Sequence, residues 1–374
     1  TTAASHALKT YTSPFPSTVS QLLSSHGAHL TSKTNLDEFA MGSHSQSSHF
    51  GPVRGPLSPA HSPGGSSGGS AVAVATAHAW AALGTDTGGS VRVPAAYTGV
   101  VGFKPSYGRV SRWGVLAYAH SLDTVGVLAR RVRDAALVFS VLDAHDPKDP
   151  TSLSPALRRR LPPLTPACPA PAALRIGIPR EAHITSLCPA VLSTYKALLS
   201  RLQRAGHTLH PVSLPTTRAA LPAYYILAPA EASSNLARYD GVRYGPANSS
   251  SSSSPVLYAP HRAATLGPEP RRRILLGAYT LSAPARDAHF LHAQRIRRMV
   301  QAEFDGVFTL PNPLHNTPPA PHADSVDILL LPTVPSLPPR LPSSPSAPVR
   351  DFLTDVFTVP SSLAGLPAAS VPVA

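Results

Sequence analysis

Two segments rich in glycine and serine, one on each side of an alanine-rich stretch, constrain this chain most strongly. The first is PGGSSGGS at 63–70 and the second is DTGGS at 86–90. The stretch between them, 70–83, is nearly all apolar, which predicts a buried helix rather than a surface helix. Flexible linkers have no reason to flank a core element at both ends. The glycines instead allow positive φ and close backbone approach, and N–H groups at a helix start are free to hold an anion.

Each segment carries a serine that is suited to nucleophilic chemistry. A helix that leaves and a chain that returns can place Ser66 and Ser90 at one end of the same element. Serine is a weak nucleophile that needs a base, and a second serine within hydrogen-bond reach can relay its proton. The consecutive N–H groups of Thr87, Gly88, Gly89 and Ser90 are suited to an oxyanion hole, in which one donor is typically worth about 3–4 kcal/mol of barrier.

Other chemistries fit the sequence less well. Residues 64–68 match G-x-S-x-G, but a nucleophile elbow needs a preceding strand, and PLSPAHSP at 56–63 cannot be a central strand. The chain has no G-x-x-x-x-G-K-[ST] motif, so a phosphate-binding P-loop is excluded. The paired histidines lack a third ligand at familiar spacing, so a surface or structural role is favoured over a metal site.

Composition indicates a globular chain. The 374 residues make one large domain or two ordinary ones, 43% of them are hydrophobic, and no apolar run is long enough to cross a bilayer. Two cysteines cannot form a disulfide framework, so a reducing compartment is expected. The net charge of +13 fits an anionic partner such as nucleic acid, but it equally fits the coding bias of a GC-rich source.

The hydrophobic pattern predicts an α/β fold with parallel strand pairs. A helix is expected at 17–30, ending near Gly27, and an amphipathic helix at 129–142, with Val132, Ala135, Ala136 and Phe139 on one face. Buried strands are expected at 174–178 and 327–331, and a helix at 190–205 precedes a strand at 207–214. The interruptions are a Pro-rich insert (155–171), a flexible Ser-rich loop (248–254) and two Pro-rich loops (310–323 and 335–348).

The stretch from Gly64 to Asp123 resembles the amidase signature family. GGSSGGS, then GTDTGGSVRVPAAYTGVVGFKPSYGRVSRWGV, then SLD at 121–123 follow one another in the family's order. Within that family, the chain is most similar to the A subunits of glutamyl-tRNA(Gln) amidotransferases. The further matches are TSKTNLDEFAMGS (31–43), APAEASSNLARYDGVRYG (228–245), RRRILLGAYTLS (271–282) and VPSSLAGLPAASVP (359–372). GSHSQSSHFGPV (42–53) is similar to fungal mitochondrial versions in particular.

The resemblance implies the amidase signature fold, which is a mixed central β-sheet covered by helices on both faces. One amidase signature domain would span 1–374, with its catalytic serine segments at 63–92. By family spacing the domain is truncated at both ends. A lysine in a K-D-N segment, the family's general base, would lie upstream of Thr1, and Lys9 and Lys33 are not its counterparts. A tail beyond Ala374 would complete the sheet and add an acidic contact to glutamine. We therefore expect these residues alone to be nearly inactive.

The resemblance also implies roles for individual residues. Ser90 is the acyl-ester nucleophile, Ser66 is the cis serine of the charge relay, and Thr87, Gly88 and Gly89 belong to the oxyanion hole. Tyr224 and Arg273 map onto substrate-binding residues, and an arginine can hold the substrate α-carboxylate bidentately. The alternative for Arg273 is a solvated basic cluster with Arg271 and Arg272. No metal site is expected.

The implied function is that of the glutaminase component of a glutamyl-tRNA(Gln) amidotransferase in the mitochondrial matrix. Glutamine would be hydrolysed through an acyl-enzyme, and the ammonia would convert Glu-tRNA(Gln) to Gln-tRNA(Gln). The expected partners are the B subunit of the amidotransferase and a small third subunit, in a heterotrimer that binds the tRNA. No cofactor is expected in this chain, because ATP and Mg²⁺ would be used by the partner subunit. No membrane partner is expected. Two alternatives remain, which are a stand-alone amidase on another amide and a catalytically impaired scaffold subunit lacking the family lysine.

Overall fold

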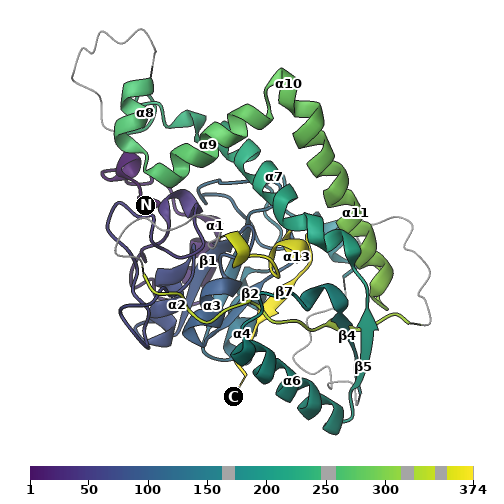
Figure 1. The fold of residues 1–374 in the computed structure, drawn as a ribbon. Helices are drawn as coiled ribbons and strands as arrows, with labels where there is room; N and C mark the ends of the chain where they lie inside the picture. The colour runs from purple at the N-terminus through teal and green to yellow at the C-terminus, as the bar shows by residue number, and fades with distance from the viewer. Residues whose placement is uncertain (162–172, 246–257, 313–323, 342–351, 374) are drawn as a thin grey trace.

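The fold consists of two β-sheets and a layer of helices (Figure 1). A computed structural model describes all residues except 162–172, 246–257, 313–323, 342–351 and 374. Its helices are α1 (Thr18–Ser25), α2 (Gly68–Ala75), α3 (Arg92–Thr98), α4 (Val132–Leu142), α5 (Pro155–Arg158), α6 (Pro189–Arg204), α7 (Ala220–Asn235), α8 (Ala259–Thr265), α9 (Pro268–Thr280), α10 (Ala283–Ala285), α11 (His292–Val307) and α13 (Val359–Leu363). Shorter turns of helix are η1 (His6–Leu8), η2 (Glu38–Ala40), η3 (Arg180–Ala182), η4 (Pro215–Ala219), η5 (Leu236–Arg238) and the π-helical η6 (Arg286–Leu291).

The first sheet is antiparallel and carries the serine segments. Its strands are β1 (Ala81–Asp86), β3 (Thr124–Ala129), β2 (Val101–Lys104) and β7 (Ala368–Ser370), in that spatial order. Every residue of β3 is buried, because successive side chains enter the two faces of the sheet. Val127 packs in the cluster with α1 and α4, whereas Leu128 packs in the cluster with α2 and α3. Helices therefore cover both faces of this sheet, as predicted.

The second sheet is parallel. It contains β5 (Thr208–Val212), β4 (Arg175–Pro179) and the two-residue β6 (Ile328–Leu329), with β4 in the centre. Helix α6 connects β4 to β5, which confirms the predicted β-α-β unit. Among the described residues the strands form two sheets instead of one mixed sheet. The two sheets come close where Thr333 Oγ1, beyond β6, lies 3.0 Å from Ser370 Oγ in β7.

The largest apolar core lies under the helical layer of α7, α9, α11 and α13. Figure 1 shows α7, α9 and α11 together in the upper part of the view, with α2 and α3 below them. Helices α7 and α9 approach closely because Gly277 has no side chain, since a Cβ there would overlap the Pro229 carbonyl. This packing places residues of α7 and α9 above the sheet that carries the serine segments.

The predicted helix at 70–83 is wrong in extent. Helix α2 ends at Ala75, Ala77 adopts a positive φ of 62°, and a strand begins at Ala81. Residues 81–86 pair with β3 along their whole length, and this tertiary pairing overrides the helical preference of alanine. Only part of α2 is buried, and Trp80 in the turn is 49% exposed.

The predictions for the buried face of α4 and for the strand at 327–331 are wrong, whereas the predictions for several other elements are confirmed. In α4 the buried face is Ala135, Val138, Phe139 and Leu142, whereas Val132 is 56% exposed and Ala136 is also exposed. The segment 327–331 contains only the short β6 and is not buried, with Ile328 41% exposed. The helix predicted at 17–30 is present but shorter, since α1 ends at Ser25, and the elements near 174–178, 190–205 and 207–214 are confirmed. The 248–254 loop and most of the Pro-rich inserts lie outside the described residues.

No helix among the described residues is both long enough and apolar enough to cross a membrane.

Candidate active site

The two serine segments meet, although they do not flank a single helix. Helix α2 leads away from the Ser66 turn, and β1 returns to the same end of the sheet and leads into the Ser90 turn. The N–H of Ser67 donates to the Ser90 carbonyl at 3.1 Å. Ser66 is fully buried and Ser90 is 9% exposed. The two predicted catalytic serines therefore lie in hydrogen-bonded stretches of backbone at the edge of the core.

The Ser66 hydroxyl is buried and unpaired among the described residues. The peptide bond between Gly65 and Ser66 is cis, as the resemblance implies. Buried polar atoms are normally hydrogen-bonded, so the Ser66 Oγ is a group that calls for a partner. None of the chain's lysines donates to it. Lys33 contacts the Thr1 hydroxyl at the surface, and the buried Lys104 donates to the carbonyls of Pro105 and Leu366.

The turn that ends in Ser90 has a fixed shape. The Asp86 carboxylate accepts the N–H groups of Val91 at 3.2 Å and Arg92 at 3.3 Å. The Thr87 hydroxyl donates to the Asp123 carboxylate at 2.8 Å, so both ends of the turn are held by buried acids. Within the described chain, the N–H groups of Gly88, Gly89 and Ser90 donate to no other group. These N–H groups are available to an oxygen anion, and the hydroxyl of Thr87 holds the start of the turn.

A buried ion pair between Asp86 and Arg92 joins the two ends of this turn. Two Arg92 nitrogens donate to the Asp86 carboxylate, at 2.9 Å from Nε and 2.8 Å from Nη2. The remaining donor capacity of Arg92 goes to the Thr358 carbonyl and the hydroxyls of Ser361 and Ser362. The guanidinium therefore joins the Ser90 turn to the start of α13. Paired with Arg92, Asp86 keeps a pKa below its ordinary value in spite of complete burial, which by itself raises that pKa.

Tyr224, predicted to bind substrate, lies against the Ser90 turn. It is a buried residue of α7, and a Cβ built on Gly88 would lie 2.7 Å from its Cζ and 2.8 Å from its hydroxyl oxygen. The glycine at position 88 is thus required by the ring of Tyr224. The next ring in α7, Tyr225, packs edge-on against Tyr224 with centroids 5.1 Å apart.

Arg273 is buried, unlike its two neighbours in α9. Arg271 and Arg272 are exposed, whereas Arg273 is 6% exposed, so a solvated cluster of all three arginines is ruled out. Its Nη1 donates to the Tyr118 hydroxyl and its Nε to Glu269, each at 2.8 Å. The guanidinium carbon lies 5.6 Å from the centre of the Tyr225 ring, within cation–π range. Arg273 and Tyr224 are therefore linked through Tyr225.

A buried acid in this region has no signal in the sequence. Asp355 accepts the hydroxyls of Ser43 at 2.8 Å and Tyr225 at 3.0 Å. Burial raises its pKa to about 6, against the opposing effect of these hydrogen bonds. A guanidinium and a carboxylate thus contact the same aromatic ring, one at its face and one at its hydroxyl. No motif in the sequence connects Asp355 with Arg273, because only the fold brings them to Tyr225.

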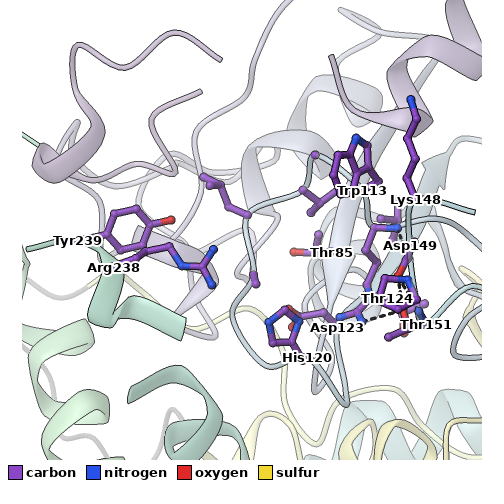
Figure 2. A pocket seen from close by; sticks show the side chains of 17 residues that line it. Thr85, Trp113, His120, Asp123, Thr124, Lys148, Asp149, Thr151, Arg238 and Tyr239 are labelled. Atoms are coloured by element: carbon purple, nitrogen blue, oxygen red, sulfur yellow. Dashed lines mark hydrogen bonds between the residues drawn. The ribbon is translucent and has the colours of Figure 1, made fainter. Parts of the chain in front are cut away.

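A cavity of about 310 Å³ opens on another side of Asp123 (Figure 2). Its lining includes Thr85 and Asp123 but neither of the two serines. Arg112 in its wall is already bonded to the Thr151 and Tyr107 hydroxyls. The cavity therefore borders the support of the Ser90 turn and is not the site where the predicted catalytic groups converge.

The chain was compared with known protein families, sequences and structures. The amidase family model matches residues 1–374. The chain is 54% identical over 391 residues to the A subunit of the mitochondrial glutamyl-tRNA(Gln) amidotransferase of Coccidioides posadasii, covering 100% of this chain and 78% of the relative. It is 50% identical over 430 residues to the protein of that name from Neurospora crassa, covering 100% and 79%. The crystal structure of the glutamyl-tRNA(Gln) amidotransferase A subunit from Thermotoga maritima superposes with a TM-score of 0.77 and 35% identity, covering 99% of this chain and 72% of that one.

Proposed function

Because this chain belongs to the amidase family, we propose that it is the glutamine-hydrolysing component of a glutamyl-tRNA(Gln) amidotransferase. The chain acts in the mitochondrion. There it releases ammonia from glutamine, and this ammonia is used to convert Glu-tRNA(Gln) to Gln-tRNA(Gln). The observation that carries this proposal is the meeting of the two serine segments, with the free N–H groups of the second turn beside them.

The proposed reaction uses Ser90 as the nucleophile. The Ser90 oxygen attacks the side-chain amide carbon of glutamine, and its proton passes to Ser66. The tetrahedral oxygen anion is held by the N–H groups of the turn from Thr87 to Ser90. The C–N bond then breaks, the nitrogen leaves as ammonia after taking up a proton, and a glutamyl ester of Ser90 remains. Water hydrolyses this ester to glutamate and restores the Ser90 hydroxyl.

The base that serves Ser66 is part of the proposal. The Ser66 hydroxyl is buried and has no partner among the described residues, which supports a base that reaches it from elsewhere. We assign this role to a lysine outside these 374 residues. Positioned acid–base catalysis typically contributes about 10²–10⁴-fold to the rate, so activity depends strongly on this group.

Substrate recognition is proposed for the residues around Tyr225. Free glutamine carries an α-carboxylate and an α-ammonium group next to each other. Arg273 can hold the carboxylate through paired N–H donors, and Asp355 is a buried acid that accepts the hydroxyl of the same ring. Tyr224, packed on Gly88, sets the distance between this pair and the nucleophile.

The proposed assembly is a heterotrimer in which this chain joins a B subunit and a small third subunit. The chain is one component of a multi-subunit amidotransferase, since its relatives are named as the A subunit of such an enzyme. No cofactor is proposed for this chain, and ATP and Mg²⁺ would be used by the partner.

The test is glutaminase activity of the full-length protein co-purified with its partner subunits, with and without Ser90→Ala. We expect the variant to lose at least about 10³-fold in kcat and to form no acyl-enzyme with labelled glutamine. Ser67→Ala is a control in the same pair of turns, because the one hydrogen bond of the Ser67 hydroxyl within the described part of the chain goes to the Thr85 carbonyl at 3.3 Å. Retention of glutamine hydrolysis by Ser90→Ala would refute the proposal.

A further inference from the structure

The side chain of Ser45 contacts the backbone on both sides of the Ser66 peptide unit. Ser45 is fully buried, and its Oγ lies 2.9 Å from the Gly64 carbonyl oxygen and 3.1 Å from the Ser66 carbonyl oxygen. The same Oγ accepts the N–H of Gly68, the first residue of α2, at 3.0 Å. One hydroxyl from a distant part of the chain thus contacts Gly64, Ser66 and the first residue of α2.

Asp37 holds Ser45 in place. Its carboxylate accepts the N–H of Ser45 at 2.7 Å and the N–H of Ser47 at 2.9 Å. The N–H of Asp37 donates to the Ser66 carbonyl at 3.2 Å, so this residue contacts both partners. Ser45 has a φ of 53°, a conformation that residues other than glycine seldom adopt and that persists where the surroundings impose it. The bond of the Ser45 N–H to Asp37 is one of the contacts that hold the residue in this conformation, and the N–H of Val53 donates to the Ser45 carbonyl at 2.9 Å.

The carboxylate of Asp37 also packs against the Ser66 turn. A Cβ on Gly65 or on Gly42 would overlap the Asp37 carboxylate, so both positions require glycine. The Asp37 side chain therefore fills the space between the 42–47 loop and the residue that precedes Ser66. Burial raises the pKa of Asp37 to about 7, against its backbone hydrogen bonds.

The orientation of the Ser66 hydroxyl depends on its backbone. Among the described residues the Ser66 Oγ has no hydrogen-bond partner that could direct it, whereas the Ser66 carbonyl has two. Resting on the proposed function, we propose that Ser45 is a positioning residue for Ser66, with Asp37 as its support. By fixing the carbonyls of Gly64 and Ser66, the Ser45 hydroxyl sets the direction in which the relay serine points.

The first test compares Ser45→Gly with Ser47→Ala in the full-length protein co-purified with its partner subunits. Glycine suits the positive φ of position 45 and removes only the hydroxymethyl group. We expect kcat for glutamine hydrolysis to fall about 10–100-fold, as for a catalytic group displaced by about 1 Å, with KM changed less than about twofold. Ser47→Ala should retain normal kcat, because within the described chain the Ser47 hydroxyl makes no hydrogen bond. Normal kcat in Ser45→Gly overturns the proposal.

The second test separates positioning from a general structural defect. The Ser45→Gly change is repeated in a Ser66→Ala background, and kcat is compared around the cycle. If Ser45 acts through Ser66, its removal causes no further loss once the Ser66 hydroxyl is gone. An equal loss in both backgrounds assigns Ser45 a structural role only and overturns the proposal.

Failure of the positioning proposal is distinguishable from failure of the proposed function. Activity that survives Ser66→Ala contradicts the relay itself, whatever Ser45 does. Activity that is lost in Ser66→Ala but normal in Ser45→Gly contradicts the positioning role alone. If Ser45→Gly does not fold, Ser45→Cys supplies the second variant, since a thiol is a weaker donor of similar shape, and it should show the same fall in kcat at a smaller amplitude.

Discussion

Arg92 and Asp86 form a buried ion pair across the turn that ends in Ser90, with Nη2 and Oδ1 2.8 Å apart. Asp86 precedes the turn and Arg92 opens the helix that follows it. Their side chains are 3% and 0% exposed, respectively, so neither charge is hydrated by solvent. The pair fixes the path of the backbone from one residue to the other, and the turn between them presents the N–H groups assigned to the oxyanion.

We expect Arg92→Met to destabilise the protein by about 3–5 kcal/mol, because it leaves the buried Asp86 carboxylate without its counter-charge. The measurement is the free energy of unfolding by chemical denaturation. The double variant Asp86→Asn/Arg92→Met removes both charges and should be more stable than Arg92→Met alone. A single variant within about 1 kcal/mol of the parent would mean that the turn does not depend on this pair.

We expect Arg273→Gln to raise KM for glutamine about 10–100-fold, since a hydrogen bond to a charged group is worth about 1.5–3 kcal/mol. The kcat at saturating glutamine should change less, because the lost contact is made in the ground state as well. Arg272→Gln is the matched control, since the Arg272 side chain is 53% exposed and forms an ion pair with Glu269 at the surface. Equal KM values for the two variants would remove Arg273 from the substrate site.

Gly88→Ala should reduce kcat at least about 10-fold. The new Cβ would lie 2.7 Å from the Tyr224 Cζ, so either the turn or the ring must move, and a shift near 1 Å is costly for catalysis. Gly306→Ala in α11 is the control, because nothing lies within 4 Å of the added methyl group. The measurement is kcat for both variants in a steady-state glutaminase assay. A normal kcat for Gly88→Ala would contradict the close contact with Tyr224.

His44 makes stability depend on pH. Burial lowers its pKa to about 4, and its ring nitrogens lie 3.3 Å from the hydroxyls of Ser62 and Thr354. Between pH 6.5 and 4 the unfolded chain takes up a proton on this side chain and the folded chain does not. Stability is therefore lost as pH falls through this window, by at most about 1.4 kcal/mol per pH unit, and the loss stops below pH 4.

The measurement compares the free energy of unfolding of the parent and of His44→Gln at pH 7.0, 5.5 and 4.5. Other groups titrate in both proteins, so the difference between the two curves isolates His44. We expect the difference to shift in favour of the variant as the pH falls. Parallel curves would show that His44 titrates alike in the folded and unfolded chain.

The core of the site was predictable because it is local in sequence. The segments that contain Ser66 and Ser90 can be recognised in the sequence by their glycines. The fold requires glycine at such positions, for example at Gly88, which contacts Tyr224. The extent of the element between them was not predictable. An alanine-rich run favours helix, and the pairing of Ala81–Asp86 with β3 depends on residues some forty positions further along.

The surroundings of the site were predicted only in part. Tyr224 and Arg273 came from the family resemblance, and their burial agrees with a role inside the protein. Asp355 has no local signal, and the quoted stretch 42–53 contains four serines without showing which of them contacts the site. The partners of Asp355 and Ser45 lie far away in sequence, so only the folded chain reveals that each contacts a residue of the proposed site.

The contacts of Arg92 with the segment around α13 join two parts of the chain that are far apart in sequence. Three of the five hydrogen bonds of the Arg92 side chain go to Thr358, Ser361 and Ser362. During synthesis the ribosome delivers these acceptors long after both serine turns have emerged. The path of the Ser90 turn therefore depends on residues that are more than 260 positions away in the sequence.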